Sequence, residues 1–151
     1  MKPELREAIA RARSEGDFDR LLRAIPYAGV LGLHAVSREG DLLIYMEGSE
    51  RVIGNPILPA LHGGTVGALL ESTAILKLLW ESDSIDIPKT ITLTVDYLRS
   101  GRVVDTWARA VITRLGRRVA NVQVGAWQER EDRPIAVAHA HFLLQSQDDL
   151  P

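Results

Sequence analysis

A histidine, two glycines and a carboxylate lie close together in the segment LHGGTVGALLES, residues 61–72. Gly63 and Gly64 stand where an apolar helical pattern begins, so their N–H groups are among the four at a helix start that lack an intrahelical acceptor. With the positive end of the helix dipole behind them and no side chain in front, these amides could stabilise the oxygen that gains charge during acyl transfer. Glu71, embedded in the same pattern, could attack an acyl carbon or take a proton from water.

The same residues have a purely structural explanation. "HGG" alone can be a helix start made of a polar capping residue and flexible glycines, and Glu71 could then lie on an exposed stripe. His62 could polarise a carbonyl group, or it could only hydrogen-bond the loop backbone. By themselves, these residues support the catalytic and the structural interpretation about equally.

Hydrophobic spacing predicts the elements that must hold these residues. Residues 3–24 have the three- and four-residue steps of two short amphipathic helices, and residues 32–46 predict a β-hairpin around the polar turn SREGD. Residues 47–61 have the composition of a loop, and residues 62–82 predict a helix that is apolar on nearly every face. The strands expected after this helix are KTITLTVDYL (89–98), VVDTWARAVITRL (103–115), RVANVQVGAWQER (118–130) and PIAVAHAHFLL (134–144).

This order of elements predicts an α+β fold. A helix that is apolar all round must be enclosed, and a sheet with one apolar face can enclose it by curling around it. The segments RSGR, GR and EDR between the strands are short and polar. We therefore expect four consecutive antiparallel strands with mostly hairpin connections.

Composition narrows the class of protein. A chain of 151 residues, 46% hydrophobic and 25% charged, suits one globular domain. Eighteen basic and twenty acidic residues give a net charge of -2, so neither nucleic acid nor an anionic membrane is expected as a partner. The chain has no cysteine, which excludes disulfides and cysteine nucleophiles and suits a reducing compartment. The charged start MKPELREAIARARSEGD is unlike a signal peptide and no run is long enough for a membrane span, so we expect a cytoplasmic protein.

A combination of motifs makes the catalytic interpretation more specific. "HGG" is followed by an acid nine positions after the histidine, is preceded by the asparagine-containing loop GNPILPA, and precedes a strand ending in VDYLRSGR. Together these motifs resemble the hotdog-fold acyl-CoA thioesterases of the PaaI (phenylacetic acid degradation) type, over roughly residues 28–145. The resemblance implies a curled antiparallel sheet wrapped around one long central helix. The domain boundaries then expected are an N-terminal helical extension (1–27), the hotdog domain (28–146) and a loose tail (147–151).

The resemblance also implies roles for individual residues. In that family the amide after the histidine forms the oxyanion hole, here Gly63, and the acid on the central helix is the nucleophile or the general base, here Glu71. An asparagine in the preceding loop holds the substrate or a water, for which the candidate is Asn55. A water-orienting hydroxyl at the start of the next strand corresponds to Thr90. Simple strand alternation, however, puts Thr90 on one face with Thr92, Thr94 and Asp96.

Other residues are candidates for binding rather than catalysis. Leu61, Gly64 and Tyr97 adjoin the catalytic candidates and are expected to contact the substrate. Arginines beside the turns, namely Arg99, Arg102, Arg117 and Arg118, could meet the phosphates of coenzyme A or could simply be solvated. His139 and His141 have the spacing of two metal ligands on a strand but no third ligand, and a surface or dimer-facing pair is expected. We expect no metal and no cofactor other than the coenzyme A of the substrate.

The spacing of Gly63 and Glu71 predicts a site made by two chains. Eight residues along a helix separate them by about 12 Å at a rise of 1.5 Å per residue. One carbonyl group cannot reach both groups, so Gly63 must come from one copy and Glu71 from another, with the two helices antiparallel about a two-fold axis. The resemblance likewise implies a homodimer. Many relatives pair again into homotetramers, which the sequence leaves open.

Two other functions remain possible on the sequence alone. The protein could bind an acyl thioester or another apolar ligand without hydrolysing it. It could also be a hydratase or dehydratase, although the Asp and His five residues apart that characterise hotdog hydratases are absent around the helix. The acyl group is not identified by the sequence, although the ILPAL loop and the central helix favour an apolar or aromatic one.

Overall fold

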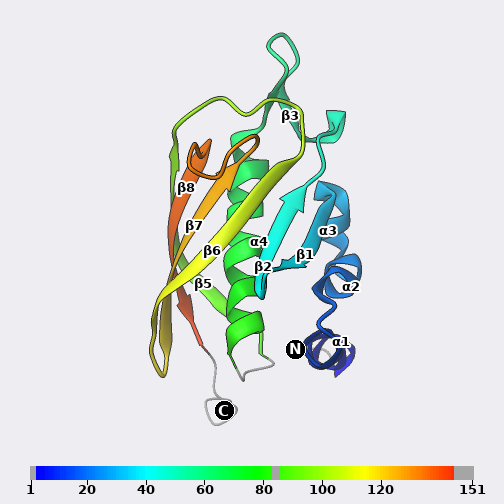
Figure 1. Cartoon of the computed structure of the whole chain (residues 1–151), viewed down its shortest axis with the longest axis vertical. Coiled ribbons are helices and arrows are strands. Elements are labelled where there is room, and N and C mark those ends of the chain that lie inside the picture. Colours follow the sequence, from blue (N-terminus) through cyan, green and yellow to red (C-terminus); the bar gives the residue numbers. More distant parts are fainter. Residues whose placement is uncertain (1–2, 83–85, 145–151) are drawn as a thin grey trace.

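The computed structural model describes residues 3–82 and 86–144, which form a curled antiparallel sheet around one long helix (Figure 1). The helices are α1 (Pro3–Glu15), α2 (Phe18–Arg23), α3 (Pro26–Leu31) and α4 (Gly63–Glu81), with a 3-10 turn at Glu50–Val52. The strands are β1 (Leu33–Arg38), β2 (Asp41–Met46), β3 (Ile53–Asn55), β4 (Ala60–Leu61), β5 (Lys89–Tyr97), β6 (Thr106–Leu115), β7 (Val119–Trp127) and β8 (Ala136–Leu143).

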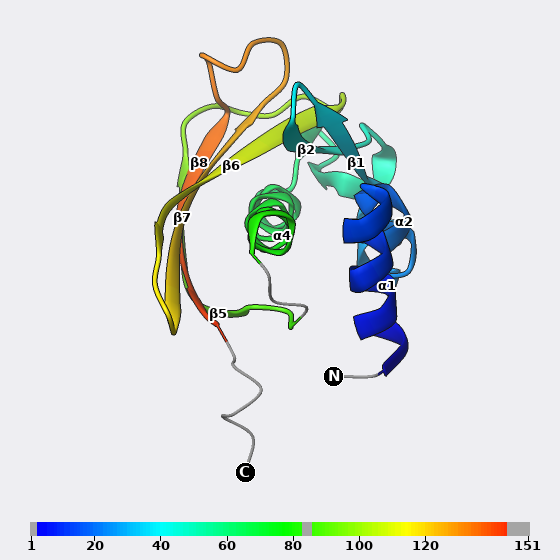
Figure 2. The ribbon, with the colours of Figure 1, turned by 60° about the horizontal axis from the view of Figure 1, so that its bottom comes forward.

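The main sheet has six strands in the order β1-β2-β6-β7-β8-β5, and each neighbouring pair is antiparallel. Figure 2 shows that the sheet curves around α4, which lies on its concave side, while α1 and α2 lie beyond β1. The predicted α+β architecture and the central helix are therefore confirmed. Within the described residues, no helix has both the length and the hydropathy to cross a membrane.

Alternation along β8 explains how the sheet can wrap the helix closely. Residues at every second position of β8 are buried and those between them are more exposed. Three of the four inward positions hold alanine, whose small side chain lets α4 approach the sheet. The inward residues are Ala136, Ala138, Ala140 and Phe142, and the central helix contributes the fully buried Leu69, Leu70 and Leu78.

The connection from β5 to β6 is not the hairpin that RSGR predicts. β5 pairs with β8 at the edge of the sheet, whereas β6 pairs with β2 and β7, so residues 98–105 cross one end of the sheet (Figure 1). Leu98 N–H and Arg99 N–H donate to Ile135 O across 2.8 and 3.0 Å, and Leu61 N–H donates to Gly101 O across 2.9 Å. The prediction was wrong because a short polar segment indicates only that the chain changes direction. It does not indicate which strands pair with each other in the sheet.

Two further segments differ from their predictions. Residues 47–61 are not all loop, because they contain the 3-10 turn and the small hairpin of β3 and β4. The N-terminal region has the two predicted helices and a third, α3, which begins at Pro26, ends at Leu31 and is capped by Gly32, a residue with a left-handed φ of 64°. The expected domain boundary between residues 27 and 28 lies within α3, and the division into domains stays a prediction. The predicted tail, residues 147–151, lies outside the described residues.

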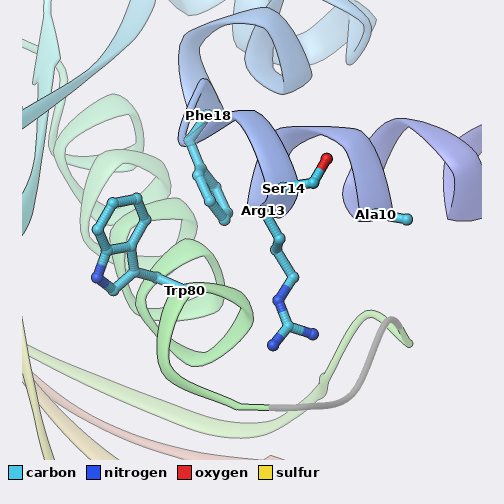
Figure 3. A pocket seen from close by; sticks show the side chains of 5 residues that line it. All are labelled: Ala10, Arg13, Ser14, Phe18 and Trp80. Carbon is cyan, nitrogen blue, oxygen red and sulfur yellow. The ribbon is translucent and has the colours of Figure 1, made fainter.

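The N-terminal helices pack against the end of α4. The rings of Phe18 and Trp80 meet edge to face, with centroids 5.1 Å apart (Figure 3). Arg6 Nη2 forms an ion pair with Asp86 Oδ1 across 2.6 Å, which ties α1 to the segment after α4. A pocket of ≈ 500 Å³ opens there, lined by Ala10, Arg13, Ser14, Phe18 and Trp80. Trp80 comes nine residues after Glu71, or about half a turn away in azimuth, so this pocket lies on the other side of α4 from Glu71.

An ion-pair network joins α4 to the sheet. Lys77 is buried and its Nζ contacts Asp41 Oδ1 across 2.5 Å and Glu81 Oε1 across 2.6 Å. Burial alone would lower the pKa of Lys77, but the two carboxylates outweigh it and the pKa is raised above 10.5. Burial alone would raise the pKa of Asp41, but hydrogen bonds from Lys77 and Leu42 N–H, with the charges of Lys77 and Arg109, hold it below 3.8.

Candidate active site

His62 caps the start of α4. Its backbone has φ -67° and ψ 130°, and its Nδ1 accepts a hydrogen bond from Gly64 N–H across 2.9 Å. Nδ1 must therefore be unprotonated in this arrangement. The His62 carbonyl oxygen accepts three more bonds, from Thr65 N–H (3.0 Å), Val66 N–H (3.2 Å) and Thr65 Oγ1 (2.7 Å). The structural role proposed for His62 is thus realised in the geometry, while its direct participation in chemistry stays a prediction.

Gly63 N–H is the amide at the helix start that remains available. Among the described residues, no atom accepts a hydrogen bond from it. Gly63 also lines a pocket of ≈ 410 Å³ at this end of the sheet. The other lining residues are Leu61, Val66, Tyr97, Leu98, Arg99, Ser100, Gly101, Ile135 and Ala136. Leu61 and Tyr97, two expected substrate contacts, are therefore beside Gly63, whereas Gly64 N–H is already bonded to His62.

Tyr97 closes one side of this pocket. Its hydroxyl donates a hydrogen bond to Gly63 O across 2.7 Å. A Cβ added to Gly63 would lie 3.4 Å from Tyr97 Cζ and Oη, and one added to Gly67 would lie 3.5 Å from Oη. The tyrosine ring therefore rests directly on a helix surface made by two glycines four residues apart. That glycine spacing is the sequence signal that could have indicated this contact.

Glu71 and Thr90 meet in the structure. Thr90 Oγ1 donates a hydrogen bond to Glu71 Oε1 across 2.7 Å. The expectation from simple alternation, which grouped Thr90 with Thr92, was wrong because the pairing register shifts between these two residues. A β-bulge at Ile91 changes the face to which the following residues point. Thr90 consequently pairs with inward-facing Phe142, while Thr92 pairs with outward-facing His141.

The sheet leaves a stripe of α4 around Glu71 uncovered. Ala68, Glu71, Ser72 and Ile75 are partly exposed, although most of the helix is buried. These residues share one helix face because Glu71, Ser72 and Ile75 come three, four and seven positions after Ala68. The neighbouring strand β5 is an edge of the sheet, and none of its nine residues is buried. A helix face left open beside an unpaired strand edge is a surface that proteins generally cover.

The chain does not bring Gly63 and Glu71 to one point. Both lie on α4, a continuous helix from Gly63 to Glu81, at positions separated by about 12 Å along the axis. Eight residues also turn the helix by roughly 80° beyond two full turns. A carbonyl carbon placed about 3 Å from both groups is therefore impossible within a single chain.

Asn55 lies at the base of the β3–β4 hairpin. Its Oδ1 accepts hydrogen bonds from Ile57 N–H (3.0 Å) and Leu58 N–H (3.3 Å), which closes the turn locally. Asn55 pairs with Ala60 of β4, which comes two residues before His62. The side-chain amide still has two N–H donors beyond this turn. A role in holding the substrate or a water stays a prediction.

The arginines selected for coenzyme A do not form one cluster within the chain. Arg99 follows the end of β5, and its Nη1 donates to Pro134 O across 2.6 Å. Arg102 pairs with Glu129. The turn between β6 and β7 carries Arg117 and Arg118 at the opposite end of the sheet, because Val119 and Lys89 both pair with Leu143. At about 3.3 Å per strand residue, the two groups are roughly 30 Å apart.

His139 and His141 point away from α4 on the convex face of the sheet, as alternation predicts. His141 Nδ1 forms a hydrogen bond with Thr92 Oγ1 across 2.8 Å. In the part of the chain that the structure describes, no third histidine or carboxylate joins them in a group that could hold a metal.

Comparison with known proteins supports the same fold. A family model of the acyl-CoA thioesterase N-terminal domain matches residues 54–143, more than half of the chain. A solved structure from Chromobacterium violaceum is 35% identical, covers 93% of this chain and 98% of its own, and has a TM-score of 0.76. None of the curated proteins matches the chain.

Two other solved structures share the fold. A phenylacetic acid degradation-related protein from Ralstonia eutropha is 25% identical, with 84% of this chain and 98% of that chain covered and a TM-score of 0.71. A Bacillus halodurans protein solved with CoA is 18% identical, covers 95% of this chain and 93% of its own, and has a TM-score of 0.68. The extent of the family match, on a chain whose sheet wraps α4 in the expected way, shows that this protein belongs to the hotdog-fold acyl-CoA thioesterases.

Proposed function

We propose that two copies of this chain together hydrolyse an acyl- or aryl-coenzyme A thioester, with Glu71 from one copy and Gly63 of the partner subunit in each site. The observation that carries the proposal is the 2.7 Å hydrogen bond from Thr90 to Glu71 on a face of α4 that the sheet leaves open. A carboxylate that only served solubility would not need an orienting hydroxyl from a strand. Family membership supports acyl-CoA thioester hydrolysis in general.

The proposed general-base route uses one water. Glu71 takes a proton from water while the water oxygen attacks the thioester carbonyl carbon, and the carbonyl oxygen gains negative charge against the partner's Gly63 N–H. When the carbonyl re-forms, the C–S bond breaks and Glu71 returns the proton to the departing thiolate. Water and thioester thus become a carboxylic acid and coenzyme A. No cofactor takes part in this scheme.

In the nucleophilic route Glu71 itself attacks the carbonyl carbon. The thiolate then leaves, an acyl group is carried on the Glu71 carboxylate, and water releases it. In both routes Thr90 holds Oε1, so the other carboxylate oxygen is available for the reaction. Hydrolysis in ¹⁸O water separates the two routes, because label recovered in the Glu71 peptide requires the covalent intermediate.

The uncovered surface supports the homodimer in this proposal. A second copy that packs its α4 antiparallel across Ala68, Glu71 and Ile75 would cover the stripe and bring its Gly63 toward Glu71. The free edge of β5 would at the same time gain a neighbour. Antiparallel packing also brings the Arg99 end of one copy toward the Arg117 and Arg118 end of the other. Both groups could then serve one coenzyme A, whose phosphates suit guanidinium groups.

The convex face of the sheet supports a further pairing of dimers into a tetramer. Val111, Val119 and Leu143 are exposed there on three adjacent strands. Light scattering on the purified protein decides between the two assemblies, since the tetramer has twice the mass of the dimer.

The pocket beside Gly63 supports an apolar or aromatic acyl group. Its side chains include Leu61, Val66 and Ile135, and only Arg99 among its lining residues carries a charge. Thiol release from short, medium, long-chain and aryl thioesters tests the proposal. Turnover of at least one class, with discrimination among them, supports it. Tight binding without thiol release for every thioester would overturn it in favour of a ligand-binding protein.

A further inference from the structure

The peptide unit between Gly63 and Gly64 is held at both of its polar atoms. Its carbonyl oxygen accepts a hydrogen bond from the Tyr97 hydroxyl across 2.7 Å, and its N–H donates to His62 Nδ1 across 2.9 Å. A peptide unit is planar, so fixing both of these atoms fixes its orientation. The two partners come from different elements, one from the end of β5 and one from the residue before α4.

The preceding peptide unit, between His62 and Gly63, is held at its carbonyl oxygen only. That oxygen accepts from Thr65 N–H, Val66 N–H and Thr65 Oγ1. Its N–H, on Gly63, has no acceptor among the described residues. The free amide thus lies between two peptide units that are each restrained by hydrogen bonds.

Glycine makes this restraint necessary. Without a Cβ, Gly63 allows close approach of an oxygen to its amide, but glycine is also the residue with the greatest backbone freedom. The two soft dihedrals of Gly63 join the restrained units on either side of it. A bond to each unit therefore limits φ and ψ of Gly63 and keeps its N–H in one direction. A fixed donor needs little reorganisation when charge develops on the oxygen that it binds.

The strand β5 provides this restraint and also holds the carboxylate. Tyr97 at its end bonds Gly63, and Thr90 near its start bonds Glu71. The ring of Tyr97 can lie on α4 because Gly63 and Gly67 present no side chain beneath it. One edge strand thereby sets the position of both functional groups that α4 carries.

We propose that Tyr97 is a positioning residue, which aims Gly63 N–H as the oxyanion donor by bonding the next carbonyl along the chain. This inference rests on the proposed function, since it assumes that Gly63 N–H binds the oxyanion. It assigns to Tyr97 an action through the backbone, which differs from direct contact with the acyl group.

The substitution Tyr97→Phe tests this role, because it keeps the ring on the glycines and removes only the hydroxyl. Loss of one neutral hydrogen bond lowers kcat about three- to tenfold, and KM stays within about twofold because the pocket wall is unchanged. Tyr27, an exposed tyrosine on α3, provides the matched control. Tyr27→Phe should keep the wild-type kcat and KM.

Amide hydrogen exchange gives a second readout that does not depend on turnover. In Tyr97→Phe, Gly64 N–H should exchange severalfold faster than in the wild type, because the carbonyl oxygen of its peptide unit has lost the bond from the Tyr97 hydroxyl. Unchanged kcat together with unchanged Gly64 exchange would overturn the proposal. A rise in KM with constant kcat would also overturn it, in favour of a direct substrate contact.

These results are distinguishable from failure of the proposed function. A wild-type protein that releases no thiol from any thioester contradicts the function, and Gly64 exchange in Tyr97→Phe still decides whether Tyr97 restrains the helix start. A second outcome is that the wild type is active, Glu71→Gln is inactive and Tyr97→Phe is fully active. This result would leave the proposed function intact and would exclude only the positioning role of Tyr97.

Discussion

Thr90 Oγ1 donates a hydrogen bond to Glu71 Oε1 across 2.7 Å, although the two residues belong to different elements and strand alternation alone would point Thr90 away from the helix. The contact exists because the pairing of β5 with β8 shifts between Thr90 and Thr92. It connects a hydroxyl to the carboxylate that stands on the open face of α4. The consequences of this contact can be measured.

Removing the Thr90 hydroxyl should lower turnover. Thr90→Val keeps the branched shape and deletes the donor, so kcat should fall about tenfold or more, as expected for a hydrogen bond to a charged group. Thr90→Ser retains the donor and should keep most of the activity. Steady-state thiol-release kinetics on both variants provide the measurement. Equal rates for valine and serine at this position would show that the hydroxyl does not assist Glu71.

Replacing Glu71 by glutamine should abolish most of the catalysis. Glu71→Gln preserves size and removes the charge needed for attack or for proton abstraction, so kcat should fall by at least ~10²-fold. The fold should persist, because Glu71 is partly exposed and lies outside the buried core. Glu7→Gln, at an exposed position of α1, serves as the control. A Glu71→Gln protein with a near wild-type rate would exclude both proposed routes.

Mixing two inactive variants should restore activity if each site uses two chains. Gly63→Pro lacks the proposed oxyanion N–H and Glu71→Ala lacks the carboxylate, so each homodimer should be inactive. In a mixed dimer, one of the two sites receives intact Gly63 from one chain and intact Glu71 from the other. Co-refolding equal amounts should therefore restore roughly a quarter of all sites. No recovery from folded, mixed dimers would contradict a site that uses Gly63 of one chain and Glu71 of the other.

The backbone at this position suits the proline substitution. Gly63 is the first residue of α4 and its φ is not positive, and proline is favoured at the first helical position. His62, the preceding residue, has φ -67° and ψ 130°, which is the conformation that proline requires before it. Size-exclusion chromatography and circular dichroism should show Gly63→Pro to be folded and dimeric before mixing.

The Lys77 network should contribute measurably to stability. Lys77→Met keeps most of the buried apolar stem but removes the cation that Asp41 and Glu81 share, which should cost about 1–3 kcal/mol in the free energy of unfolding. Urea denaturation at pH 7 measures it. The exposed pair of Arg11 and Glu7 on α1 provides a contrast, and Arg11→Met should change stability by less than about 0.5 kcal/mol. Equal effects of the two substitutions would contradict a structural role for the network.

The same network predicts how stability depends on pH. The pKa of Asp41 is lowered from 3.8, so its contribution is present above that value and is lost as the pH falls through the folded-state pKa. The pKa of Lys77 is raised from 10.5, so its contribution is present below that value and is lost as the pH rises through the folded-state pKa. The stability difference between wild type and Asp41→Asn should therefore be constant near neutrality and shrink below pH 3.8. A difference that grows on acidification would reverse the assigned sign.

Local patterns were sufficient to predict much of this molecule. The glycines after His62 and the apolar residues that follow predict where the central helix begins, because unpaired amides and hydrophobic spacing depend on neighbouring residues only. Alternation predicts which side of β8 is buried, since side chains in a regular strand change sides at every residue. The separation of Gly63 and Glu71 also follows from helix geometry alone.

Tertiary structure decided the contacts that make these residues a candidate site. β5 lies at the edge beside β8, far from its sequence neighbour β6, because strand pairing depends on the whole chain and not on one turn. The bulge in β5 turns Thr90 to the opposite face of the sheet from the one that alternation predicts. Side chains in a strand alternate between the two faces, so one extra residue exchanges the faces expected for the residues on either side of it. The contact of Tyr97 with Gly63 also depends on tertiary structure, because the end of β5 comes to the start of α4 only after the sheet has curled around the helix.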